Sequence, residues 1–132
     1  MMNTQGAAIG WTLVRGVFGL TLALGHGLPK VTGDISRFAA GVASLGFPFP
    51  TFFAWCAALT ELVGGLLVAL GLFTRPAAAF AAFTMVVALY RHRADPFGRM
   101  ELALLYLAVL AAAVLVGGGP YSLDAKVRPR KA

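Results

Sequence analysis

Four long apolar runs, separated by short polar segments, dominate the chain. They lie at about residues 9–28, 52–72, 76–91 and 100–116. A helix rises ~1.5 Å per residue, so about 20 apolar residues cross the ~30 Å hydrocarbon core of a bilayer. The third run is long enough if the arginines at its ends reach the membrane surface or if the bilayer is locally thinner. The pattern predicts an all-α integral membrane four-helix bundle, with residues 1–132 as a single domain.

The segment between the first two runs has a different pattern. Charged residues interrupt residues 29–51 and the FPFP segment cannot remain helical, so this segment is not expected to cross the membrane. Asp34 or Ser36 can cap a short helix that Gly46 ends. Its apolar side chains fall on one face, as in a helix that lies on a bilayer. The sequence therefore predicts a short interfacial helix between spans 1 and 2.

The composition agrees with a membrane protein and excludes several function classes. The chain is 59% hydrophobic and 12% charged, against ~45–50% and ~25% in soluble domains. Its net charge of +6 comes from basic residues between the apolar runs and at the C-terminus, where they suit charged lipid surfaces. We therefore expect no nucleic-acid partner. The single cysteine, Cys56, excludes an internal disulfide, a dithiol pair and a cysteine-based metal site within one chain.

An even number of spans places both termini on one side of the membrane. Each side then carries five Lys or Arg residues, so the positive-inside rule alone does not choose an orientation. The basic tail, residues 120–132, holds Lys126, Arg128, Arg130 and Lys131 close together. This dense cluster favours cytoplasmic termini.

Glu61 lies almost at the middle of the second apolar run. A carboxylate at this depth costs roughly 2.5–3.5 kcal/mol on insertion scales, so it normally faces protein and has a partner. If the first two spans are antiparallel neighbours, Arg15 lies ~9 Å and Glu61 ~16 Å from the same end. We predict a buried Arg15–Glu61 pair. It either serves a cavity, by holding an anionic or quinone-like ligand or passing a proton, or only fixes the helix register.

Other candidate ligand-binding residues are His26, Thr60 and Glu101. His26 shares a helix face with Arg15 but lies roughly 10 Å from Glu61 in depth. It either joins a proton relay or caps a helix end at the lipid headgroups. A cluster of His26 and Glu101 with His92 and Asp95 lacks metal-ligand spacing, so we predict no metal site.

Several segments, in chain order, resemble the DoxX family of small bacterial membrane proteins. They are LVRGVFGLTLALGHGLPK, LGFP, TELVGGLLVALGLFTRPAA, MELALLYLAVL and GGGPYSLDA. The resemblance implies a four-helix bundle in the bacterial plasma membrane. It also implies signature positions at Arg15, Glu61 and the Ser122–Leu123–Asp124 motif, a candidate tail or partner motif.

The resemblance also suggests a broad function. Some relatives are named as subunits of thiosulfate:quinone oxidoreductase, and others are linked to membrane complexes that handle thiol or oxidative stress. The chain has no flavin, haem or dithiol motif, so a redox role needs a quinone, a soluble or membrane redox partner, or both. We expect a membrane subunit of a quinone-linked or thiol- or sulfur-related redox system. The alternatives are a non-enzymatic scaffold for a soluble enzyme and a small-molecule carrier that works as a homo-oligomer.

Overall fold

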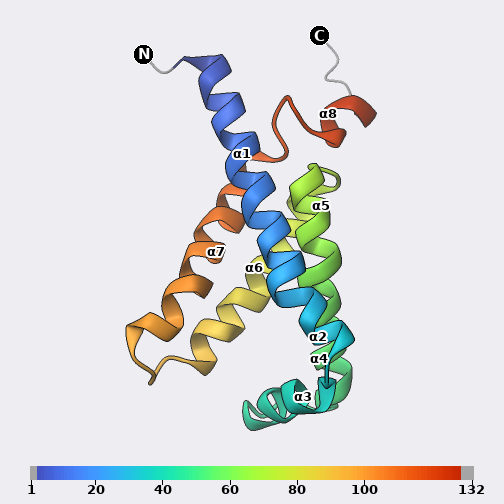
Figure 1. The fold of residues 1–132 in the computed structure, drawn as a ribbon, viewed down its shortest axis with the longest axis vertical. Coiled ribbons are helices and arrows are strands. Elements are labelled where there is room, and N and C mark those ends of the chain that lie inside the picture. The colour runs from blue at the N-terminus through green and yellow to red at the C-terminus, as the bar shows by residue number, and fades with distance from the viewer. Residues whose placement is uncertain (1–2, 129–132) are drawn as a thin grey trace.

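The computed structural model describes residues 3–128, and these residues contain helices and no strand (Figure 1). The first helical rod joins α1 (Thr4–Leu22), the π-helical turn η1 (Ala23–Gly27) and α2 (Leu28–Thr32). The second joins α4 (Pro50–Leu59), the π-helical turn η2 (Thr60–Gly64) and α5 (Gly65–Leu70). The remaining helices are α3 (Ile35–Ser44), α6 (Thr74–Arg91), α7 (Phe97–Val116) and α8 (Leu123–Val127).

Within residues 3–128, three helices are long and apolar enough to cross a membrane. They are Thr4–Thr32, Pro50–Leu70 and Phe97–Val116. The predicted all-α membrane class is therefore confirmed. The third predicted run lies in α6, which forms a hairpin with α7 (Figure 1).

The first helical rod continues past its expected end at residue 28. Pro29 has no N–H to donate, so an ordinary helix loses a hydrogen bond at this point. Here the chain forms a wider turn, in which the N–H of Leu28 donates to the carbonyl oxygen of Ala23. The rod then runs to Thr32, and Lys30 lies on a helix instead of in a loop.

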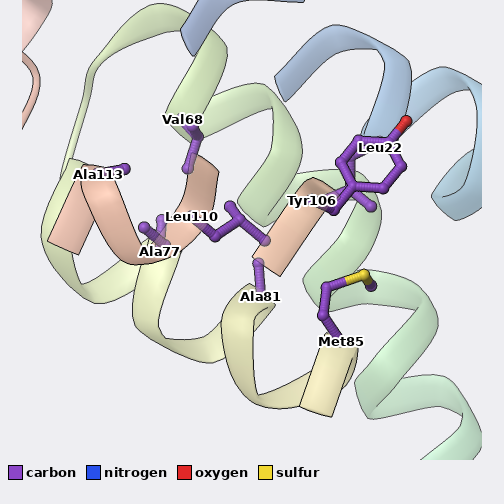
Figure 2. Packing of buried hydrophobic residues seen from close by; sticks show 9 residues of the cluster. Leu22, Val68, Ala77, Ala81, Met85, Tyr106, Leu110 and Ala113 are labelled. Atoms are coloured by element: carbon purple, nitrogen blue, oxygen red, sulfur yellow. The ribbon is translucent and has the colours of Figure 1, made fainter. Parts of the chain in front are cut away.

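The main apolar core lies where α6 and α7 meet the two rods (Figure 2). Small residues of α6, among them Ala78 and Ala81, are fully buried and allow α7 to approach closely. Larger side chains fill the space between the helices; they are Leu22, Val68, Met85, Tyr106 and Leu110.

Close backbone contacts fix the register of the two antiparallel rods. A Cβ atom on Gly19 would lie 2.6 Å from both the Ala69 nitrogen and the Gly65 carbonyl oxygen. Further along the rod, Gly27 lies against the backbone of Glu61 and Leu62. Gly27 is therefore opposite Glu61, and Arg15 is ~18 Å further along the rod.

The predicted Arg15–Glu61 pair is wrong, because Arg15 binds the end of α5 instead. Its Nη1 donates to the carbonyl oxygens of Val68 at 2.7 Å and Ala69 at 2.5 Å, and its Nη2 donates to that of Tyr121 at 2.9 Å. The last carbonyls of a helix have no partner within the helix, and this end attracts cations. Arg15 is 1% exposed, so it satisfies these groups inside the protein.

The C-terminal segment folds back onto the turn between α5 and α6. The Asp124 carboxylate accepts hydrogen bonds from the Phe73 N–H at 2.8 Å, the Thr74 N–H at 3.0 Å and the Thr74 hydroxyl at 2.7 Å. Ser122 caps α8, since its hydroxyl accepts from the Ala125 N–H. The motif predicted at Ser122 and Asp124 thus makes internal contacts, while Arg130 and Lys131 of the tail lie outside the described residues.

These hydrogen bonds set the charge state of Asp124. Burial raises the pKa of its carboxyl, but the hydrogen bonds from Thr74 and Phe73 lower it, and the resulting pKa lies below the ordinary value. The carboxylate therefore stabilises the fold fully above about pH 4. This stabilisation is lost as the pH falls through the lowered pKa.

The contact of Gly19 with the second rod predicts that alanine substitutions at two glycines of α1 affect stability differently. In Gly19→Ala the new methyl group overlaps the backbone of the second rod, so we expect a loss of about 1–3 kcal/mol in unfolding free energy. The control is Gly16→Ala, because a Cβ at Gly16 meets nothing within 4 Å. Thermal unfolding in detergent micelles measures both. Equal melting temperatures for the two variants would contradict the proposed register.

Asp124→Asn is expected to lower the unfolding free energy by about 1.5–3 kcal/mol at neutral pH, because an amide replaces a charged acceptor of three hydrogen bonds. The difference from the wild type should shrink as the pH falls below about 4. Thermal unfolding at several pH values measures this. A pH-independent difference for Asp124→Asn would contradict the account.

Candidate functional site

The partner of Glu61 is Lys30, on the first rod. Lys30 Nζ lies 2.6 Å from Glu61 Oε2. Glu61 is 4% exposed, and Lys30 Nζ also lies 4.6 Å from the centroid of the Phe38 ring in α3. A buried carboxylate without a cation is strongly destabilising. Glu61 therefore has the partner that its position in the second apolar run requires, but this partner is Lys30 and not the predicted Arg15.

The two π-helical turns face each other at this position. One turn holds His26, and the other holds Thr60 and Glu61. His26, Lys30 and Glu61 line the same cavity. A π-helical turn shifts side chains relative to an ordinary helix, and such turns are frequent at functional sites. The structure thus brings three of the predicted site residues together.

Beside these groups lies a cavity of about 570 Å³. Ligand pockets are usually ~300–1,000 Å³, mostly apolar, with a few polar groups. Side chains from both rods, α3, α6 and α7 line this cavity, and most are apolar. Its polar lining includes His26, Lys30, Thr60, Glu61, Thr84 and Tyr106.

Tyr106 is a site residue that the sequence analysis did not identify. It is 4% exposed, and its ring contacts Phe18 and His26 edge to face, with centroids 5.7 Å and 5.5 Å apart. The hydroxyl points away from Leu110 and Ala81 (Figure 2). It forms no hydrogen bond within the described part of the chain. The sequence does contain a signal for it. Tyrosines gather at the membrane surface, and Tyr106 lies instead in the middle of an apolar run.

The remaining candidate, Glu101, is exposed on α7 and does not line the cavity. Cys56 does line it. Among residues 3–128, no group of three or more His, Cys, Asp or Glu side chains is placed to hold a metal ion. The site therefore offers a partly buried ion pair and several uncharged hydrogen-bonding groups beside apolar walls.

The arrangement can bind a flat apolar molecule that carries hydrogen-bond acceptors. The Lys30 ammonium, the Tyr106 hydroxyl and the Thr60 hydroxyl are donors. Glu61 is an acceptor and a titratable group at the cavity wall. Such a set can orient a ligand and exchange a proton with it.

A comparison with known proteins identifies a family for this chain. A family model described as DoxX matches residues 10–93, which is more than half of the chain. The match includes the second helical rod and the first rod from residue 10 onward, and Tyr106 and the Ser122–Asp124 motif lie beyond it. No curated protein and no solved structure matches the chain. The extent of the family match shows that the chain belongs to the DoxX family.

Proposed function

We propose that this chain is the membrane subunit of a quinone-linked redox system, with the quinone headgroup in the cavity. The observation that carries the proposal is the buried Glu61 carboxylate at the wall of an apolar cavity, paired with the partly buried Lys30. An ion pair in this position has a cost, because both groups lose water. A ligand that needs a charged donor and a proton exchanger would explain its presence.

The cavity residues fit a quinone in their chemistry. A quinone accepts electrons and protons when bound, and its two carbonyl oxygens accept hydrogen bonds. Lys30 and Tyr106 supply donors, and the apolar walls suit the ring. Glu61 would hold the proton, and Lys30 would stabilise the carboxylate after the proton leaves. His26, beside Tyr106, would connect this group to further proton carriers.

The electrons would come from a redox partner. The chain contains no flavin, haem or dithiol motif, so the proposed system needs a donor subunit or a soluble donor of thiol or sulfur chemistry. The cavity of about 570 Å³ is large enough for a ligand within one chain, which supports a binding subunit over a carrier that needs an oligomer to form its site.

We propose a membrane arrangement of four spans in one domain. One of these spans is α6, which its length and hydropathy alone do not identify as a span. The hairpin with α7 and the tight turn after α5 support this arrangement. The α3 helix would lie in the interface, and its capping by Asp34 supports a separate short helix. The start of α1 and helix α8 lie at the same end of the molecule (Figure 1). We propose that this end is cytoplasmic and that the membrane is the bacterial plasma membrane.

The function is tested with Glu61→Gln. This change keeps the shape of the side chain but removes its exchangeable proton, so we expect quinone reduction in membranes to fall by about 10²–10⁴-fold. Asp34→Asn, an acid-to-amide change outside the cavity, is the matched control. Protein abundance and partner co-purification are measured in parallel.

The same experiment separates the redox subunit from a scaffold. A scaffold predicts wild-type quinone reduction in Glu61→Gln and loss of the partner from membranes when residues 126–132 are deleted. That combination would reject the proposed function.

The topology is tested with single cysteines in a Cys56→Ala background. We place them at Gln5, Asp34, Asp95 and Lys126, all within the described residues. A reagent that cannot cross the membrane should label positions 34 and 95 in intact cells, and positions 5 and 126 only after lysis. The reverse pattern would invert the orientation, and labelling of 34 and 95 on opposite sides would reject the four-span arrangement.

A further inference from the structure

The end of the cavity nearest the α6–α7 loop is basic. Arg91 ends α6, His92 follows it and Arg99 lies in the first turn of α7, and all three line the cavity. We name these three residues the cationic mouth. Arg99 is ~10 Å from Tyr106 along α7. Arg99 is thus separated along α7 from Tyr106, one of the groups proposed to hold the quinone.

Acidic side chains offset only part of this charge. Asp95 is hydrogen-bonded to His92 at 2.6 Å and lies 3.9 Å from Arg99. Arg91 has no ion pair within residues 3–128. Deeper in the cavity, Glu61 is paired with Lys30. The cationic mouth therefore retains an excess of positive charge.

Arg91 is seated between two helices. Its guanidinium lies against Gly41 of α3, where a Cβ atom would overlap it. The arginine side chain therefore extends from α6 to α3 at the cavity entrance. The planar guanidinium can bind two oxygens of a phosphate at once, which a lysine ammonium cannot do.

Apolar side chains adjoin the cationic mouth. Phe80, Phe83 and Leu102 line the same cavity and are 69%, 62% and 47% exposed. In a membrane these side chains meet lipid chains. A small inorganic anion would leave the apolar space unfilled, whereas a ligand with an anionic head and an apolar chain matches both parts.

We propose that the cationic mouth binds the phosphate of an acidic phospholipid. Arg91 is the main ligand, Arg99 is the second, and an acyl chain lies along Phe80, Phe83 and Leu102. Basic pockets between helices near the membrane surface bind acidic headgroups for the same electrostatic reason. This lipid site goes beyond the proposed function, because the lipid occupies the entrance and the quinone the deeper part of the cavity.

The test is a titration of the purified full chain in neutral detergent with phosphatidylglycerol or phosphatidylcholine, read by native mass spectrometry. We expect phosphatidylglycerol to bind more tightly by at least about fivefold, as one charge near the membrane surface contributes. Arg91→Gln should weaken phosphatidylglycerol binding about fivefold, and Arg91→Gln with Arg99→Gln about 30-fold. Arg91→Lys, which keeps the charge but loses the two parallel donors, should bind more tightly than Arg91→Gln and less tightly than the wild type.

Arg93→Gln is the matched control. Arg93 is exposed, stacks on the Tyr90 ring and donates to the Tyr90 carbonyl oxygen, and it does not line the cavity. An equal loss in Arg93→Gln would show diffuse surface attraction and overturn the proposal. Equal binding of the two lipids would overturn it as well. Displacement of phosphatidylglycerol by inorganic phosphate at a similar concentration would show that the site binds a free anion, and this would also overturn the proposed lipid site. Because no quinone is present, these results are independent of the proposed redox function.

Discussion

The close approach of two antiparallel helical rods determines the partners of Arg15 and Glu61, the two buried charges in the described part of this protein. Where Gly19 meets Gly65 and Ala69, there is no space for a larger side chain, so the rods cannot slide past each other. This register places Gly27 opposite Glu61 and brings Lys30 within reach of the carboxylate. It also places Arg15 beside the end of α5. Two buried charges thus find different partners because of one packing contact.

The polar groups at the two ends of the rods have different physical roles. At the α8 end, Arg15 and Asp124 bind backbone groups that helix termini leave without partners, so both side chains are used within the fold. At the other end, Lys30 and Glu61 bind each other beside a cavity, and the Tyr106 hydroxyl has no partner in the described residues. Structural and ligand-binding roles therefore separate along the membrane normal that we propose.

The π-helical turns connect the fold to the site. In the first rod, the wide turn allows the helix to continue through Pro29. Lys30 therefore lies on a helix within reach of Glu61. The turn that faces it holds Glu61. Both turns lie within the part of the chain that the DoxX family model matches, residues 10–93. Tyr106 adds a group from beyond the matched region, so the cavity is completed by the last long helix.

The sequence by itself determined the helical class and the membrane character, because both follow from the length and apolarity of local runs. It also identified Glu61, since a carboxylate at that depth needs a partner whatever the fold. Only the tertiary structure decided which cation that partner is. The span ends predicted from polarity placed Lys30 in the polar segment after the first span and Arg15 near Glu61. Backbone packing and a π-helical turn set the actual register. Pairing between distant residues depends on that register, which local patterns of polarity do not encode.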